Sequence, residues 1–290
     1  MPMLGVIGGS GLYDLGGVAK RDEIQVATPF GDPSSPIVTG ELAGVRVAFL
    51  ARHGRGHVFG PSDVPYRANV YAMRSLGVTH CLSVSAVGSL RDELTPRTAV
   101  IPDQVIDRTL QRPRTFFDNG VVAHVGIADP FCASFRGTVH DHAAAVHAPV
   151  ADGGTYVCIE GPQFSTRAES ELYRSWNASV IGMTAMPEAR LAREAGLCYA
   201  MLAMVTDYDV WHDVEEDVTV EMVQRVLHDN VETGRAVIRR LCENSLTECE
   251  SGCRHALDGA IITDPAHLSP EAAARVALFA PPQDPTQVTT

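Results

Sequence analysis

Residues 186–209 read MPEARLAREAGLCYAMLAMVTDYD and hold a complete helix–turn–strand unit. The first eleven residues have helical spacing, with Pro187 near the first turn and Gly196 at the end, positions that these residue types favour. The apolar run that follows, 197–205, is typical of a strand buried on both faces. Such a unit predicts an α/β protein.

The alternation of strands and helices extends over most of the chain. Further strands are expected at 3–9, 45–51, 79–90, 98–106, 155–161 and 179–184, and helices at 63–76 and 219–241. We therefore predict an α/β fold with one domain, a twisted mixed β-sheet flanked by helices. The sequence changes character near residue 245. We assign 1–244 to the main domain and 245–290 to a C-terminal extension with a short helix after Ser269 and a disordered tail.

The bulk composition narrows the class of protein. A formal net charge of −12 argues against a nucleic-acid partner. No apolar stretch reaches the length of a membrane span, and the start MPMLGVIGGSG lacks the basic region and apolar core of a signal peptide. We expect a cytoplasmic protein with no membrane partner.

Seven cysteines are scattered along the chain, at 81, 132, 158, 198, 242, 249 and 253. Most lie in apolar runs, and thiols of cytoplasmic proteins are normally reduced. The spacing Cys249-x3-Cys253 is not a usual zinc or redox spacing. We expect structural or incidental thiols and no metal, with a disulfide as the alternative.

The acidic pair at the end of the quoted stretch is the first candidate for chemistry. Along a strand, Asp207 and Asp209 would point the same way, and no Lys or Arg stands beside them. Two buried like charges repel, which raises the pKa of one carboxyl. Either this is a solvated strand end, or a ligand that needs carboxylates binds above it.

Other buried strands also end in polar residues, and such ends converge at one edge of an α/β sheet. GGSG offers backbone N–H groups and the Ser10 hydroxyl. In ARHGRGH, Arg52 could bind an anion through two N–H groups and His53 could donate one more hydrogen bond. SAVGS places Ser85 at a strand end. The remaining candidates are Phe164 and Ser165 in IEGPQFSTRAES, and Met183 and Thr184 in IGMTAMPEA.

Several of these motifs have competing interpretations. GGSG is not a dinucleotide fingerprint, because Asp14 stands where the third glycine belongs, and it lacks the Lys of a Walker loop. Arg-His-Gly also occurs in histidine phosphatases, but there it normally follows the first strand. A metal site from His53 and His57 is not expected, because no carboxylate or thiol partner is suggested.

Together the fragments resemble one family. GVIGGSGLYD, TPFGDPS, ARHGRGH, YRANVYAM, SAVGSLR, IDRT, ADPFC, IEGPQFSTRAES, GMTAMPEA and MVTDYD occur in this order. The set is similar to 5′-methylthioadenosine phosphorylases, in the trimeric branch of the purine nucleoside phosphorylases, over roughly residues 4–242. The resemblance implies a nucleoside phosphorylase-like fold and phosphorolysis of methylthioadenosine to adenine and 5-methylthioribose 1-phosphate, with no cofactor besides the co-substrate phosphate.

The resemblance also implies roles for residues. Phosphate binding falls to Ser10, Arg52, His53, Ser85, Thr184 and the backbone of Ala86. Binding of the base and sugar is implied for Phe164, Ser165, Met183, Asp207 and Asp209. An apolar pocket for the methylthio group is implied for Val220 and Val223. His124 would reach into the site of a neighbouring subunit, which implies a homotrimer, or a hexamer as in some relatives.

The acidic pair suits adenine, which has a basic N7 and a donating 6-amino group. A protonated carboxyl can donate to N7 and a carboxylate can accept from the amino group. We predict that Asp207 serves N7 and Asp209 the amino group, although the spacing alone allows the reverse. Phosphorylases of 6-oxopurine nucleosides, which the chain also resembles, carry Asn at position 207 and Glu at 183.

Three alternatives follow from the same residues. The nearest is a purine nucleoside or methylthioinosine phosphorylase. A phosphohydrolase that uses His53 as phospho-acceptor is more distant, and so is a nucleoside-binding protein that has lost the reaction.

Overall fold

The strand predicted from the apolar run is β11 (Cys198–Asp207), and all ten of its residues are buried. In the computed structural model of the chain, its side chains alternate between two cores. Tyr199 and Met201 join one hydrophobic cluster, and Ala200 and Leu202 join the other. The strand is therefore covered on both faces, as its continuous hydrophobicity predicts.

The structure describes residues 2–9, 12, 17–147, 149–212, 220–244 and 246–279, without the side chains of 220–229. The elements are β1 (Met3–Gly8), β2 (Ala19–Ile24), β3 (Ile37–Leu42), β4 (Val45–Ala51), α1 (Tyr66–Ser75), β5 (His80–Ser89), β6 (Ala99–Ile101), β7 (Gln104–Arg108), α2 (Ala133–Ala144), β8 (Val150–Asp152), β9 (Thr155–Ile159), α3 (Arg167–Ser175), β10 (Val180–Gly182), α4 (Glu188–Glu194), β11, α5 (Val220–Glu243), the short 3-10 helices η1 (Cys253–His255) and η2 (Pro265–His267), and α6 (Pro270–Val276). Among these described residues, no helix is both long and apolar enough to cross a membrane.

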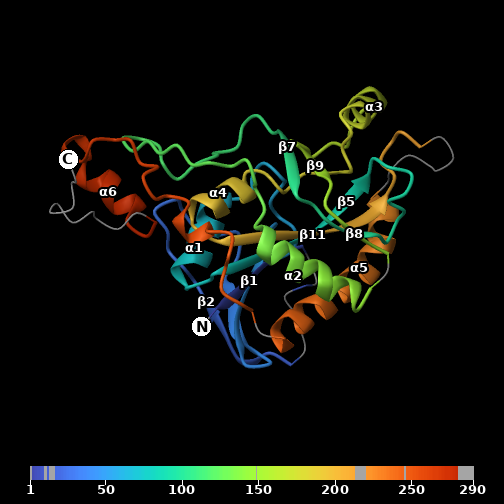
Figure 1. Ribbon diagram of the computed structural model, residues 1–290, viewed down its shortest axis with the longest axis horizontal. Coiled ribbons are helices and arrows are strands. Elements are labelled where there is room, and N and C mark those ends of the chain that lie inside the picture. Colours follow the sequence, from blue (N-terminus) through green and yellow to red (C-terminus); the bar gives the residue numbers. More distant parts are fainter. Residues whose placement is uncertain are drawn as a thin grey trace.

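The strands form one mixed sheet of 11 strands with helices on both faces, which confirms the predicted fold class (Figure 1). One path runs β2-β3-β4-β1-β5-β10-β9-β7, and β11, β6 and β8 branch from β5. The pairs β1–β4, β1–β5 and β5–β11 are parallel, so the carboxyl ends of these four strands meet at one edge.

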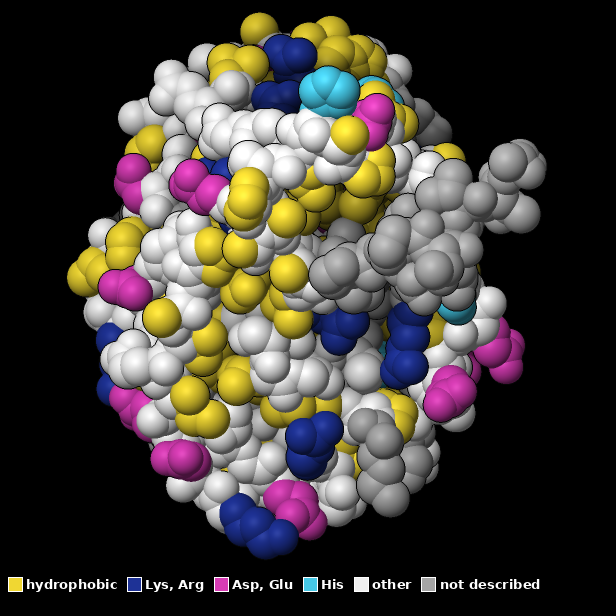
Figure 2. Space-filling model, turned by 90° about the vertical axis from the view of Figure 1, so that its left-hand side faces the viewer, with side chains coloured by type: hydrophobic (Ala, Val, Ile, Leu, Met, Phe, Trp, Pro, Cys, Tyr) yellow, Lys and Arg dark blue, Asp and Glu magenta, His cyan; other side chains and the backbone are white. Residues whose placement is uncertain are grey.

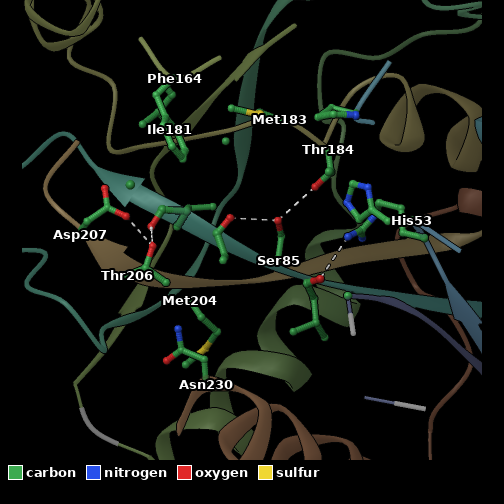
Figure 3. Close-up of a pocket in the computed structure, with 18 of the residues that line it drawn as sticks. His53, Ser85, Phe164, Ile181, Met183, Thr184, Met204, Thr206, Asp207 and Asn230 are labelled. Carbon is green, nitrogen blue, oxygen red and sulfur yellow. Dashed lines mark hydrogen bonds between the residues drawn. The ribbon is translucent and has the colours of Figure 1, made fainter. Parts of the chain in front are cut away.

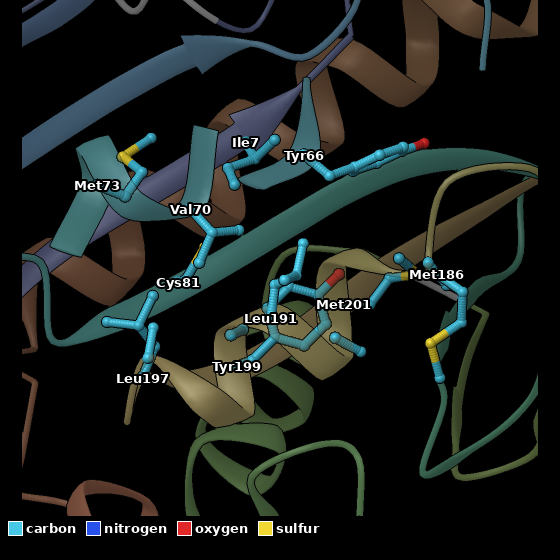
Figure 4. Packing of buried hydrophobic residues seen from close by; sticks show 14 of the residues in the cluster. Ile7, Tyr66, Val70, Met73, Cys81, Met186, Leu191, Leu197, Tyr199 and Met201 are labelled. Atoms are coloured by element: carbon cyan, nitrogen blue, oxygen red, sulfur yellow. The ribbon is translucent and has the colours of Figure 1, made fainter. Parts of the chain in front are cut away.

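Helices α1 and α4 pack against each other and cover one face of the sheet, and α2 and α5 pack together on the other. In the first layer, Tyr66, Val70 and Met73 of α1, Leu191 of α4 and Met201 of β11 belong to one hydrophobic cluster (Figure 4). The ends of the two predicted helices agree closely with α1 and α4. Apolar periodicity and a terminal glycine are thus reliable guides in this chain.

The partner of β5 changes along its length, and this change opens the sheet. On the edge away from β11, β1 pairs with residues 80–83 of β5, whereas β10 pairs antiparallel with Gly88 and Ser89. Among the described residues, no strand pairs with 84–87 on that edge. The backbone of this segment therefore faces an opening at a topological switch point, where α/β sheets commonly bind ligands.

Some expectations differ from the structure. The strand predicted at 98–106 is two strands, β6 and β7, because Pro102 between them has no N–H to donate to a ladder. In the extension, the Ser269 hydroxyl accepts a hydrogen bond from the amide of Ala272 (3.1 Å) and caps α6. Phe279 stacks near Phe116 of the main domain, with ring centroids 4.3 Å apart. The predicted disordered tail begins beyond the described residues.

Candidate active site

A cavity of about 310 Å³ lies at the opening in the sheet, beside the carboxyl ends of β1, β4, β5 and β11. It brings together ten of the predicted residues: Arg52, His53, Ser85, Ala86, Phe164, Ser165, Met183, Thr184, Asp207 and Asp209. Figure 3 shows Asp207 at one end and His53 at the other, with Ser85 and Thr184 between them. The sheet topology explains why these ten residues converge, because the strands that carry several of them end at the same edge.

Arg52 is fully buried and held by the protein itself. Its Nε donates to Glu188 Oε2 (3.0 Å), and its Nη2 donates to Ser83 Oγ (2.6 Å) and lies 3.3 Å from Glu188 Oε1. Burial alone would lower the pKa of Arg52, but Glu188 more than offsets this and raises it. The Nε–Nη2 edge of Arg52 already binds Glu188, so the structure leaves this edge no room for a bidentate contact with an anion.

What Arg52 retains for a ligand is a fixed positive charge and part of Nη1. Nη1 donates to the Val84 carbonyl (3.3 Å), and the described residues offer no acceptor for its second N–H. Glu188 is itself fixed, because Tyr199 donates its hydroxyl to Oε1 (2.8 Å). Sequence reasoning missed Glu188, since it lies 136 residues from Arg52.

His53 is neutral at physiological pH and has one ring nitrogen committed. Its Nδ1 lies 3.0 Å from the carbonyl of Phe59, and because a carbonyl only accepts, Nδ1 carries the proton. Burial, with Arg52 nearby, lowers the pKa of His53 to about 4. The His57 ring stacks on it at 4.3 Å. Nε2 is therefore an acceptor, not the donor that the sequence suggested.

Two hydroxyls and a free strand edge form the middle of the cavity. Ser85 Oγ and Thr184 Oγ1 lie 3.1 Å apart, in a hydrogen bond that either hydroxyl can donate, and the amide of Thr184 donates to the Tyr156 hydroxyl (3.5 Å). The backbone of residues 84–87, which includes Ala86, lacks a strand partner on this side. Hydroxyls and amides of this kind bind anionic oxygens well.

The two acids at the other end are both buried, at 5% exposure for Asp207 and 8% for Asp209. Asp207 accepts two hydrogen bonds, from the Thr206 hydroxyl to Oδ2 (2.6 Å) and from the Asp209 amide to Oδ1 (2.8 Å). A bulge in β11 and a left-handed backbone at Asp209, with φ of 55°, turn this residue back beside the strand end. The strand register brings Gly88 opposite Asp207.

The environments of the two carboxyls differ. Burial, reinforced by the charge of Asp207, raises the pKa of Asp209 to about 6. Its Oδ2 is buried and has no hydrogen bond of normal geometry among the described residues, although the nearby Ser170 hydroxyl offsets part of the rise in pKa. Ser165 and Asn230 also line the cavity. Their Oγ and Nδ2 atoms are buried and have no hydrogen-bond partner among the residues that the structure describes. Unpaired buried polar atoms that border one cavity indicate a polar ligand.

An apolar wall completes the cavity. Phe164 is 44% exposed and lies beside Ile181, with Met183 next to them (Figure 3). Arg112, which the sequence gave no reason to select, positions this wall. Its guanidinium donates to the carbonyls of Met183 and Glu160, both at 2.6 Å.

Four predicted residues are not placed in the cavity. Ser10 lies outside the described residues, and so do the side chains of Val220 and Val223. His124 is exposed and does not line the cavity of its own chain; its amide donates to the Ala260 carbonyl (2.8 Å). Its role in a neighbouring site stays a prediction.

Comparisons with known proteins agree with this architecture. Residues 3–243 match the phosphorylase superfamily. The chain is 52% identical to S-methyl-5′-thioadenosine phosphorylase of Geobacter sulfurreducens over 96% of this chain and 97% of that one, and 53% identical to the enzyme of Koribacter versatilis over 90% and 89%.

Solved structures are similar as well. A methylthioadenosine phosphorylase from an Antarctic soil metagenomic library superposes with a TM-score of 0.90 at 46% identity, covering 97% of this chain and 99% of that one. The Schistosoma mansoni enzyme in complex with adenine gives 0.79 at 38% identity, covering 83% and 91%. By sequence and by fold, the chain belongs to the phosphorylase superfamily.

Proposed function

We propose that this protein catalyses the phosphorolysis of 5′-methylthioadenosine to adenine and 5-methylthioribose 1-phosphate. The observation that carries the proposal is one cavity with a buried acid pair at one end and an anion-binding cluster at the other. Relatives that are about 50% identical bear the name of this enzyme, and a related structure contains methylthioadenosine.

The reaction places three demands on the site. The C1′–N9 bond breaks as a phosphate oxygen bonds to C1′, so the purine must accept the bonding electrons and the sugar passes through an oxocarbenium-like state. A proton or hydrogen bond at N7 makes the purine a better leaving group. Phosphate and nucleoside must be held in line.

The acid pair meets the demand at the base. Asp207 accepts hydrogen bonds at both oxygens, whereas the pKa of Asp209 is raised to about 6. We therefore assign the proton of the free enzyme to Asp209. This favours the reverse of the division predicted from the sequence, with Asp209 donating to N7 and Asp207 accepting from the 6-amino group.

The opposite end of the cavity suits phosphate. Ser85, Thr184 and the free backbone edge at Ala86 supply donors, and Arg52 supplies a fixed positive charge. Neutral His53 would accept a hydrogen bond at Nε2 from a phosphate O–H, because its Nδ1 already donates to Phe59. Phe164 and Met183 are assigned to the planes of the base and ribose, and Val220 and Val223 to the methylthio group. Ser10 completes the phosphate set, and no cofactor is needed.

We further propose a cytoplasmic homotrimer in which His124 completes a neighbouring site. The segment beside His124 exposes apolar side chains, since Val122 is 46% and Ile262 is 60% exposed. Figure 2 views the molecule from the side of α6 and shows apolar side chains down the middle of this face, with acidic ones mostly nearer its rim. Such surfaces favour association. Mass determination in solution tests the trimer against the hexamer.

The test of the reaction follows release of free base. The protein is incubated with methylthioadenosine, methylthioinosine, adenosine or inosine, with and without phosphate. We expect adenine release from methylthioadenosine to be the fastest and to require phosphate. Faster release of hypoxanthine would favour the 6-oxopurine alternatives, and hydrolysis of phosphate monoesters would favour the phosphohydrolase.

A further inference from the structure

Four cysteines from distant parts of the chain meet away from the cavity. Cys132 caps α2, Cys198 begins β11, Cys249 lies in the C-terminal extension and Cys253 begins η1. Their four Sγ atoms all lie within 4.8 Å of one another. Three of the residues are buried and Cys249 is half-buried. We propose that these four cysteines bind one zinc ion in a closed, structural site.

The spacing of the sulfurs fits a tetrahedron. With Zn–S bonds of about 2.3 Å, the sulfurs of a tetrahedral site lie about 3.8 Å apart. Sγ of Cys132 and Sγ of Cys249 are 3.7 Å apart, and no pair in the group exceeds 4.8 Å. Disulfide bonding requires about 2.05 Å, and all seven cysteines are free in the structure. Four thiolates leave no open coordination position, which is typical of structural zinc.

The surroundings favour thiolates. The amide of Phe135, in the first turn of α2, donates to Cys132 Sγ (3.4 Å), where the helix N-terminus favours negative charge. Nη1 of Arg193 lies 3.8 Å from Cys253 Sγ. Zinc with four thiolates has a net charge of −2. Hydrogen-bond donors beside the sulfurs stabilise this charge, as residues that surround the ligands of metal sites commonly do.

The position of the cluster gives it a role in holding the chain together. Cys249 and Cys253 belong to the extension, whereas Cys132 and Cys198 belong to the main domain. The ion would fasten the extension to the start of β11. Asp207 lies at the other end of this strand, roughly 30 Å away at about 3.3 Å per residue, so the ion takes no part in the reaction.

From the sequence we expected no metal, because we placed Cys249-x3-Cys253 outside the usual zinc and redox spacings. A spacing of three nevertheless lies within the range of zinc ligand pairs. The other two ligands come from positions that only the fold brings near. The fold therefore brings together four cysteines, of which the local spacing indicates only two.

The test begins with the wild-type chain. The protein is purified in the absence of chelator and then dialysed, and we expect about one zinc ion per chain by elemental analysis. Exchange with cobalt should give the intense visible absorption of a tetrahedral cobalt thiolate. After denaturation with chelator, all seven thiols should react with a thiol reagent. Removing zinc should lower the melting temperature.

Variants locate the site. Cys249→Ser with Cys253→Ser should abolish zinc binding and the cobalt spectrum. Cys242→Ala is the control, because Cys242 is buried, as Cys253 is, and lies outside the cluster; it should retain zinc. The proposal is overturned if the wild type holds no metal after expression with zinc, or holds iron instead. It is also overturned if only five or three thiols react after denaturation without reductant, since one or two disulfides would remove two or four of the seven.

Discussion

Replacing Asp209 by Asn removes the titratable proton and keeps nearly the same side-chain shape. The wild-type carboxyl has a pKa of about 6, because it is buried and lies beside Asp207. At pH 7 about one tenth of the free enzyme would hold the proton, and at pH 8 about one hundredth. Asn cannot transfer a proton, so we expect kcat/KM for methylthioadenosine at pH 6 to fall by about 10²–10⁴.

The pH profile gives the sharper assay, but phosphate itself titrates in the same range. Dividing the wild-type kcat/KM by that of the variant at each pH removes the titration of phosphate. The ratio should be flat below pH 6 and fall about tenfold per unit above it. A ratio that is flat from pH 5 to 8, or that rises, would refute the assignment of the proton to Asp209.

The same substitution has a consequence for stability. The pKa of Asp209 is raised from 3.8 to about 6 on folding, so the unfolded chain releases a proton that the folded protein keeps. The free energy of unfolding of the wild type therefore falls as the pH rises from 3.8 to about 6, by about 1.4 kcal/mol per pH unit and about 3 kcal/mol in total. Relative to wild type, Asp209→Asn should gain this amount between pH 4 and 6 and then stay level. Unchanged differences in melting temperature across this range would contradict the burial argument.

Three further variants test the rest of the site. Glu188→Gln removes the charge that partners buried Arg52 and should destabilise the protein by about 3–5 kcal/mol, measured by denaturant unfolding; a loss below 1 kcal/mol would contradict a buried pair. Gly88→Ala places a Cβ 3.0 Å from Asp207 Oδ1 and should lower kcat/KM roughly 10–100-fold, because the acids must shift; an unchanged kcat/KM would show that the strand end yields freely. Asp207→Asn should reduce turnover of methylthioadenosine far more than turnover of inosine, and equal losses in parallel assays would count against adenine recognition by this residue.

Local patterns predicted several of the buried elements, but not the strand β3 or the helix α2. The continuous apolar run gave β11, and the terminal glycines gave the ends of α1 and α4. Strand β2 was missed because AKRDEI is almost entirely exposed and shows neither an apolar run nor alternation. Pro102 explains why one predicted strand is two.

The site was predictable only where each residue carries its own signal. Polar strand ends and the resemblance selected ten of the residues that line the cavity, including the acid pair. Arg52 and Glu188 are joined across 136 residues, and Arg112 contacts backbone carbonyls that no spacing reveals. The raised pKa of Asp209 depends on burial and on a bulge that the sequence does not show.

The most direct test of the central claim is phosphate-dependent base release from four nucleosides under identical conditions. We predict that methylthioadenosine has the highest kcat/KM, that adenine and 5-methylthioribose 1-phosphate form in equal amounts, and that omitting phosphate stops the reaction. Faster phosphorolysis of inosine or methylthioinosine, or adenine release that continues without phosphate, would contradict it.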